Sequence, residues 1–388
     1  MATFEILEIA ILAVAALFWI DTGWGAARGA RRMPGLADLA PLPDEALPSL
    51  TIVATAKDEA ARVEHAARSL LAQRYPRLSV LIVDDRSTDG TGAILDRLAA
   101  EDPRLRVLHV TALPEGWIGK CHALARGAAA SDSEWILFTD GDVTMSPDAV
   151  RLAVSLGARG GYDHVTLGPE IVVEGLAEAI FVGAFLIIFN GTQKPWLAAD
   201  PRKKNAMGVG AFNLVRREAY LRSGGHERLR LELLDDMALG KIVKQSGGRQ
   251  VVARHAGLVR VRWHHGLRGL IRGVEKNAFP ATRFSVPLTL LAPIVQLALA
   301  AAPYAGLFLP GPAPRWLALI AWTGVFLAYH EASRNARIGW WQALLMPVGV
   351  LLFNYALLRS MAITLARGGV AWRGTFYSLE ELKRGRVW

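Results

Sequence analysis

The stretch that decides the fold reads Ser79-Val80-Leu81-Ile82-Val83-Asp84-Asp85-Arg86-Ser87-Thr88-Asp89-Gly90-Thr91. It opens with an apolar run rich in β-branched side chains, which is typical of a buried strand. Two acidic residues, Asp84 and Asp85, end that run, and a turn of Ser, Thr, Asp and Gly follows. A helical pattern begins at Thr91. A buried strand that passes through a short turn into a helix predicts an α/β sheet.

The same alternation of strand and helix continues on both sides of this stretch. Further buried strands are expected at 50–54, 106–110 and 135–139. Helical spacing of apolar residues predicts helices at 59–73, 91–100 and 119–130. Strands that alternate with helices predict an α/β fold with a parallel sheet and helices on both faces.

A second acidic cluster, Asp140-Gly141-Asp142, follows the strand at 135–139. Ligands bind beyond the carboxyl ends of strands in such sheets, so this cluster and Asp84-Asp85 are expected at one edge. Each cluster alone is also explained by turn chemistry. A hard cation such as Mg²⁺ or Mn²⁺ takes carboxylate ligands together with substrate phosphates. We therefore predict Asp140 and Asp142 as metal ligands, with Asp140 also near the donor.

The turn at 83–91 resembles the nucleotide-binding turn of glycosyltransferase family 2 enzymes, which have a GT-A fold. In that family an Asp of this turn accepts a hydrogen bond from uracil, which implies this role for Asp84 or Asp85. The run Ala56-Lys57-Asp58-Glu59 is similar to the family's first-strand turn, where the nucleoside docks. The resemblance thus implies nucleotide-sugar contacts for Ala56, Asp58 and Glu59, with Asp58 standing where Asn is more usual.

Three further stretches extend the resemblance. Lys120 opens the helix after Gly116-Trp117-Ile118-Gly119 and is expected to pair with the donor diphosphate. Asp235-Asp236 matches the family's catalytic acidic pair, whose second member is the general base, and also suits a helix first turn. Arg260-Val261-Arg262-Trp263 is similar to the Gln-x-x-Arg-Trp motif, which implies donor and acceptor contacts for Arg262 and Trp263. Val259 stands at the Gln position, which argues against a processive polymerase.

The flanks of this domain are apolar. The mean hydropathy of the chain is +0.26 and its formal charge is +9. Residues 4–20 form an apolar run followed by Arg28, Arg31 and Arg32, which predicts an outside N-terminus and a cytoplasmic catalytic domain. We find no nucleic-acid fold signature, so the basic excess is interpreted as membrane flanks. Cys121 is the only cysteine, so no internal disulfide is possible, and we interpret it as a packing residue.

Further apolar stretches lie at 286–309, 316–329 and 340–365, and the connection before the last carries Arg334 and Arg337. A single crossing by the last stretch would put the basic tail outside, against the positive-inside rule, so a re-entrant or interfacial helix is the alternative. The run at 171–190 also has two interpretations, a buried core helix or an interfacial helix that guides a lipid acceptor, with Glu170, Glu174 and Glu178 on one face.

The expected organisation is a transmembrane helix at 1–22, a catalytic domain at 48–280, membrane helices at 286–366 and a basic tail at 367–388. The motifs around Lys120, Asp140 and Asp236 are similar to those of hopene-associated and carotenoid-type glycosyltransferases. This resemblance implies inverting, metal-dependent transfer of one sugar from a UDP-sugar to a lipid, by a multi-pass protein of the cell (inner) membrane. The alternatives are a processive polysaccharide synthase and a membrane scaffold with a non-catalytic transferase-like domain.

Overall fold

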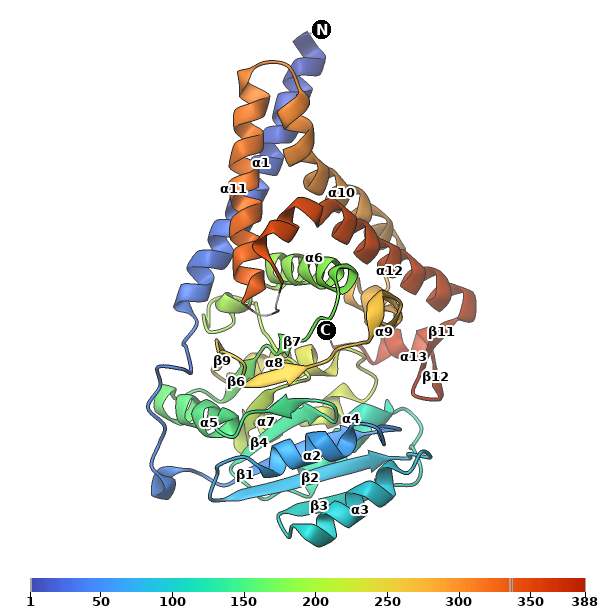
Figure 1. The fold of residues 1–388 in the computed structure, drawn as a ribbon. Coiled ribbons are helices and arrows are strands. Elements are labelled where there is room, and N and C mark those ends of the chain that lie inside the picture. The colour runs from blue at the N-terminus through green and yellow to red at the C-terminus, as the bar shows by residue number, and fades with distance from the viewer. Residues whose placement is uncertain (1, 335, 337, 388) are drawn as a thin grey trace. The chain divides into compact units, whose positions relative to one another are not determined.

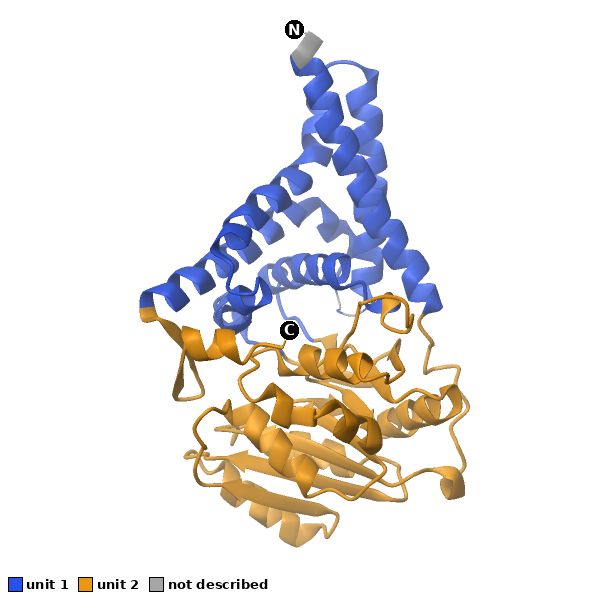
Figure 2. Ribbon diagram, turned by 180° about the vertical axis from the view of Figure 1, so that it is seen from behind, with its two compact units in different colours: residues 1–32, 172–196, 263–366 blue, residues 33–171, 197–262, 367–388 orange. Residues whose placement is uncertain are grey.

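The computed structural model describes residues 2–334, 336 and 338–387 (Figure 1). Arg337, in the predicted cytoplasmic connection, and Trp388, at the end of the predicted tail, lie outside the described residues. The chain forms two compact units, each built from three separate segments (Figure 2). Unit 1 comprises Met1–Arg32, Val172–Trp196 and Trp263–Ala366, and unit 2 comprises Met33–Ile171, Leu197–Arg262 and Arg367–Trp388.

Unit 2 is built on a seven-stranded sheet with the order β3-β2-β1-β4-β8-β6-β9. The first four strands along the chain are mutually parallel and are β1 (Leu50–Ala56), β2 (Leu78–Asp85), β3 (Leu105–Val110) and β4 (Trp135–Asp140). The remaining three are β6 (His164–Leu167), β8 (Asn213–Arg216) and β9 (Gln250–Ala253). Strand β8 runs antiparallel to β4 and β6. The α/β fold is therefore confirmed, with one reversed strand that the sequence patterns did not predict.

The register of the central strands brings the two acidic clusters together. Ala56 pairs with Asp84 across β1 and β2, and Thr55 pairs with Asp140 across β1 and β4. The carboxyl end of β1 is therefore flanked by an acidic residue on each side. This edge of the sheet is where a parallel α/β fold binds its ligands.

Helices cover both faces of this sheet, as predicted. One face packs against α2 (Val63–Leu71), α3 (Thr91–Glu101) and α5 (Ala149–Gly160). The other face packs against α4 (Gly119–Ala129), α7 (Arg217–Ser223) and α8 (Asp235–Gln245). Side chains alternate along β1, since Ile52 and Ala54 join the first core and Val53 joins the second.

Helix α2 begins four residues later than the predicted helix at 59–73. The backbone N–H groups of Glu59 and Ala60 donate to the side chains of Thr91 and Asp89, and not to helical carbonyl groups. These residues therefore belong to a turn that is tied to the start of α3.

Two small sheets complete unit 2. One has the order β5-β10-β7 and consists of β5 (Thr144–Met145), β10 (Val259–Val261) and β7 (Glu170–Ile171). The other is the hairpin of β11 (Gly369–Trp372) and β12 (Thr375–Ser378), which is followed by α13 (Leu379–Arg384). The short 3₁₀ helices η1 (Asp44–Ala46) and η3 (Gly225–Leu229) lie in connections.

Unit 1 consists of long helices, most of which are apolar. They are α1 (Ala2–Arg32), α6 (Leu176–Gln193), α9 (Gly266–Ala281), α10 (Val286–Phe308), α11 (Pro312–Ser333) and α12 (Met346–Arg367), preceded by η4 (Trp340–Leu345). A further 3₁₀ turn, η2 (Pro195–Leu197), follows α6. Helices α1 and α11 cross where Gly23 meets Gly324, and a Cβ at Gly23 would lie 2.1 Å from the Gly324 carbonyl oxygen. Small residues that allow such close backbone approach are typical of helix crossings in membranes.

Three helical stretches are long and apolar enough to cross a membrane, namely Leu176–Leu197, Val286–Phe308 and Trp340–Arg367. The last two coincide with predicted membrane stretches, and the first contains α6. The expectation that Glu170, Glu174 and Glu178 share one helical face was wrong. Glu170 lies in β7, Glu174 precedes α6, and the buried Glu178 accepts hydrogen bonds from the backbone N–H groups of Glu174 and Gly266.

Candidate functional site

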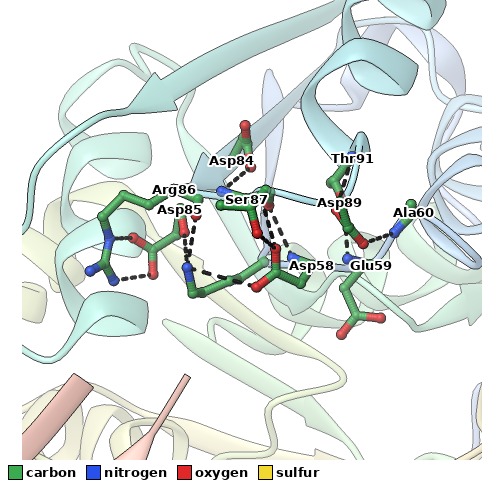
Figure 3. Close-up of polar contacts among 11 residues, drawn as sticks. Asp58, Glu59, Ala60, Asp84, Asp85, Arg86, Ser87, Asp89 and Thr91 are labelled. Carbon is green, nitrogen blue, oxygen red and sulfur yellow. Dashed lines mark hydrogen bonds and ion pairs between the residues drawn. The ribbon is translucent and has the colours of Figure 1, made fainter. Parts of the chain in front are cut away.

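The turn after β1 is fastened to the turn after β2 by side-chain hydrogen bonds (Figure 3). Oδ1 of Asp58 accepts from the backbone nitrogen of Thr88 at 2.8 Å, and the backbone nitrogen of Asp58 donates to Oγ of Ser87 at 3.0 Å. Asp58 is in the left-handed region at φ 53°, which Asp tolerates better than most residues. Asp58 therefore has a structural role, since it links the two turns. Its predicted contact with the nucleoside stays a prediction.

The two carboxylates after β2 are both engaged within unit 2. Both oxygens of the fully buried Asp85 accept from the guanidinium of Arg86, at 2.7 and 3.0 Å. Asp84 accepts from the backbone nitrogen of Ser87 and lies 3.0 Å from Nδ1 of His109. Asp96 and Asp84 together raise the pKa of that imidazole. Asp85 has no exposed surface and Asp84 is also buried, so the predicted contact with a nucleobase stays a prediction.

Lys120 is not a surface lysine but the centre of a buried acidic cluster. Its Nζ lies 2.9 Å from Oδ1 of Asp140 and 3.3 Å from Oδ2 of Asp235. Burial by itself lowers the pKa of Lys120, but the charges of Asp140, Asp235 and Asp236 outweigh it and raise that pKa. The cation is therefore permanent, and it joins the end of β4 to the starts of α4 and α8.

Gly210 connects the predicted base Asp236 to the predicted metal ligand Asp140 through its backbone. Its nitrogen donates to Oδ2 of Asp236 at 2.7 Å, and its carbonyl oxygen accepts from the backbone nitrogen of Asp140 at 3.0 Å. A Cβ at this position would lie 2.6 Å from Oδ2 of Asp140. Gly208 is equally constrained, because its Cβ would lie 1.8 Å from the Asp236 carbonyl oxygen. These contacts explain the Gly208-Val209-Gly210 spacing.

The environment of Asp236 suits a proton acceptor near neutral pH. Burial and the neighbouring charge of Asp235 raise its pKa to about 6, while Lys120 and the N–H of Met237 act in the opposite direction. A base with a pKa just below the working pH is ionised and still accepts a proton readily. Asp235 differs, since it is 4% exposed and pairs with Lys120. The geometry assigns Asp235 to orienting the lysine and leaves Asp236 as the candidate base.

Asp140 and Asp142 each lie beside a cation within unit 2. Oδ2 of Asp142 is 3.7 Å from Nη1 of Arg62, and Lys120 occupies one oxygen of Asp140. Among the described residues, no three His, Cys, Asp or Glu side chains form a metal-binding group. Burial and the charges of Asp140 and Glu59 raise the pKa of Asp142 to about 6, so negative charge is crowded here. Two such carboxylates fit a Mg²⁺ or Mn²⁺ ion that completes its shell with phosphate oxygens and water.

Arg262 follows β10, which pairs antiparallel with β5. Val259 pairs with Met145 and Arg260 with Thr144, so the same register continued by two residues would put Arg262 opposite Asp142. The predicted donor contact of Arg262 stays a prediction. Trp263 begins a segment of unit 1, where its ring lies 4.7 Å from that of Phe185. Unit 2 does not contain it, and its acceptor role stays a prediction.

Several residues at this edge of the sheet were not predicted as site residues. Arg62 and Gly210 are described above, and the pKa of the buried His226 is lowered to about 3 by burial and by Lys120. Two more, Arg373 and Tyr377, belong to the C-terminal segment that the sequence patterns suggested only as a basic tail. Their positions depend on long-range packing, and no local pattern in the sequence marks them. Cys121 is buried as expected, and burial raises the pKa of its thiol.

Comparison with known proteins agrees with this geometry. The model of glycosyl transferase family 2 matches residues 51–222, which include most of β1 and all of β2 to β8. The 4,4'-diaponeurosporenoate glycosyltransferase of Staphylococcus aureus (strain USA300) is 25% identical over 342 residues, covering 86% of this chain and 89% of the relative. The match extends well beyond the catalytic sheet, so the two proteins share most of their length.

A solved structure shows the same fold. The mannosyltransferase PcManGT from Pyrobaculum calidifontis, in complex with GDP-Man and Mn²⁺, superposes with a TM-score of 0.52 at 21% identity, covering 89% of this chain and 99% of that chain. The fold is therefore that of a GT-A glycosyltransferase. The chain carries a glycosyl transferase family 2 domain and is a glycosyltransferase.

Proposed function

We propose that this glycosyltransferase, which carries a family 2 domain, transfers a single sugar from a UDP-sugar to a hydroxyl or carboxylate of a membrane lipid. The observation that carries the proposal is the position of Asp236, which Gly210 orients beside the Lys120–Asp140 pair. A proton acceptor thus lies in one cluster with the predicted metal motif. The name of the Staphylococcus aureus relative gives an apolar carotenoid acid as its substrate, which supports a lipid acceptor here.

Transfer to a hydroxyl with inversion requires one base and one displacement, whereas a carboxylate acceptor is already ionised at neutral pH and attacks the sugar without a base. Asp236 takes the proton of the acceptor hydroxyl as that oxygen forms a bond to the anomeric carbon. The bond from the anomeric carbon to the diphosphate oxygen breaks in the same step, and the nucleoside diphosphate leaves. With a pKa of about 6, Asp236 is ionised at neutral pH and ready for this step. Its two backbone hydrogen bonds hold the carboxylate in one orientation.

The donor is expected to lie along the carboxyl ends of β1, β2 and β4. A Mg²⁺ or Mn²⁺ ion at Asp140 and Asp142, when bound, neutralises charge on the departing diphosphate. The Mn²⁺ in the PcManGT complex supports this cofactor class. Ala56 and the turns after β1 and β2 would hold the nucleoside, because their cross-bonding gives that end of the site a fixed shape. Lys120 keeps Asp140 and Asp235 in place throughout.

We infer the membrane topology from the continuity of unit 2. Its three segments pack into one compact unit, so they lie on the same side of any membrane. Between residues 171 and 197 the chain leaves unit 2 and returns to it, and this segment contains a single long helix, α6. A single crossing of the membrane by α6 would leave the chain on the opposite side from unit 2. We therefore propose that α6 does not cross and lies at the interface or within the protein.

The longer segment outside unit 2, from 263 to 366, must cross the membrane an even number of times for the same reason. Helices α10 and α11 are joined by a short turn at Pro310-Gly311-Pro312 and form the natural pair of crossings. Helix α12 then begins and ends on the catalytic side. With α1 as a third crossing, the catalytic unit and the C-terminal segment are both cytoplasmic. The basic residues of 28–32 and 367–386 agree with that orientation.

A screen of UDP-sugars tests the proposed function. Purified protein with Mn²⁺ is expected to release UDP from one of them, and the label of that sugar is expected in a lipid extract of the membranes. A long labelled polymer would instead support a processive synthase. Absence of both UDP-sugar turnover and UDP binding would support a non-catalytic scaffold.

A further inference from the structure

The C-terminal segment is anchored beside the catalytic machinery of unit 2. The backbone nitrogen of Val387 donates to Oε2 of Glu232 at 2.8 Å, and Nζ of Lys241 donates to the Val387 carbonyl oxygen at 3.0 Å. Leu382 of α13 is fully buried. Glu232 and Lys241 lie just before and within the helix that begins with Asp235 and Asp236. The segment is therefore a fixed part of the catalytic unit.

The hairpin of this segment reaches the start of α4. The buried Tyr377 of β12 accepts a hydrogen bond at 3.2 Å from the backbone nitrogen of Gly119, the residue before Lys120. Burial raises the pKa of the Tyr377 hydroxyl, and the charges of Arg86 and Asp85 act on it in opposite directions. Tyr377 thus fastens the hairpin to the opening of α4, one of the elements expected to flank the donor.

Arg373 occupies the tip of the same hairpin. It and Gly374 have φ values of 49° and 78°, as a tight two-residue hairpin turn requires. Its guanidinium carbon lies 5.4 Å from the ring centre of Trp372. Nη1 is buried, yet it has no hydrogen-bond partner among the described residues. An unsatisfied buried donor on a charged group is costly and calls for an explanation.

The surroundings of Arg373 indicate what would satisfy it. Burial raises the pKa of Glu59, while the charges of Arg373 and Arg62 oppose that shift and those of Asp140 and Asp89 add to it. Arg373 therefore lies near Glu59, in the region of the predicted metal motif and the first-strand turn. A guanidinium offers several donors in a plane that matches phosphate oxygens. A diphosphate bound at this edge would supply the missing acceptor.

We infer that the C-terminal hairpin completes the donor site, with Arg373 contacting the diphosphate of the nucleotide-sugar and Tyr377 holding the hairpin at α4. This inference rests on the proposed function, since it assumes a nucleotide-sugar donor. It gives residues 367–388 a role in donor binding and not only in membrane orientation.

The test is calorimetric titration of the purified full-length protein with Mn²⁺ and either UDP or GDP. Two nucleotides are used so that a preference for one nucleobase does not prevent detection of the diphosphate contact. The variant Arg373→Gln removes the charge but keeps an unbranched side chain at the positive φ. Arg384→Gln is the matched control, because Arg384 is an exposed residue of the same segment that pairs with Glu380. The unfolding temperature of each variant checks that the fold is retained.

Arg373→Gln is expected to weaken diphosphate binding by about 10-fold to 100-fold, as loss of charged hydrogen bonds does. Binding of the nucleoside alone should not change, and Arg384→Gln should bind like the wild type. Wild-type affinity in Arg373→Gln, or equal losses in both variants, would overturn the inference. Failure of the wild-type protein to bind either nucleotide would instead overturn the proposed function.

Discussion

The ammonium nitrogen of Lys120 lies 2.9 Å from Oδ1 of Asp140. The same nitrogen lies 3.3 Å from Oδ2 of Asp235, so one side chain joins three elements that are far apart in the sequence. The ion pairs account for how these residues stay together. Buried charges need such partners, because an isolated charge inside a protein is strongly unfavourable.

Removing the lysine should therefore destabilise unit 2. In Lys120→Met the carboxylates of Asp140 and Asp235 lose their buried partner, and a broken buried pair costs about 3–5 kcal/mol. We expect a clear fall in the unfolding temperature measured in detergent. Adding Asp235→Asn to the same variant should recover part of that loss, since one buried charge is then removed. An unchanged unfolding temperature in Lys120→Met would contradict this account of the pair.

The pKa of Asp236 predicts how activity depends on pH. Burial and the charge of Asp235 raise this pKa from 3.8 to about 6, and only the ionised form accepts a proton from the acceptor. The rate at saturating donor and metal should be constant above neutrality. Below pH about 6 it should fall about tenfold for each pH unit, as a single ionisation requires. A rate that stays constant from pH 7 to pH 5 would exclude Asp236 as the base.

Gly210 should be intolerant of any side chain. A Cβ there would lie 2.6 Å from Oδ2 of Asp140 and 3.4 Å from Oδ2 of Asp236, so Gly210→Ala displaces the carboxylate of Asp140 and crowds that of Asp236. Small displacements of catalytic groups cost about 100-fold in rate. Gly168→Ala is the matched control, because nothing lies within 4 Å of a Cβ at that position. Comparable turnover numbers in both variants would show that the Gly210 contact does not matter.

Single-cysteine labelling tests the proposed topology. In a Cys121→Ala background, Ala313→Cys lies in the first turn of α11, next to its connection with α10, and Arg384→Cys lies in α13. An impermeant maleimide applied to intact cells should label Ala313→Cys and leave Arg384→Cys unlabelled until the membrane is opened. Labelling of Arg384→Cys from outside would contradict the proposed topology, in which the whole of unit 2 lies in the cytoplasm.

The sequence predicted the parts of the fold that depend on local pattern. The strands ending at Asp85 and Asp140 have continuous apolar runs, so their positions were correct within two residues. The reversed strand β8 was not predicted, because Asn213–Arg216 is short and its direction depends on its partners. The contacts of Arg373 and Tyr377 also depend on a chain that returns after a long apolar segment. No periodicity in a sequence encodes such a return.

In the candidate site, too, the sequence predicted what local motifs mark and missed what depends on long-range contacts. Asp140 and Asp236 were predicted from motifs, and the structure brings both to Gly210. The pairing of Lys120 with Asp140 was not predicted, because a lysine at a helix start suggests a phosphate contact and its burial is invisible in the sequence. The prediction that three glutamates share one helical face was wrong, because the helix begins only at Leu176 and the residues before it form a strand and a turn.

The most direct test of the account is the Asp236→Asn variant, assayed for transfer of labelled sugar into membrane lipid and for UDP binding. Asn keeps the shape of the side chain and loses the base, so we expect transfer to fall by about 10²–10⁴-fold. UDP affinity should stay at the wild-type value, and the exposed control Asp132→Asn should be fully active. Wild-type transfer by Asp236→Asn would contradict the central claim that this carboxylate activates the acceptor.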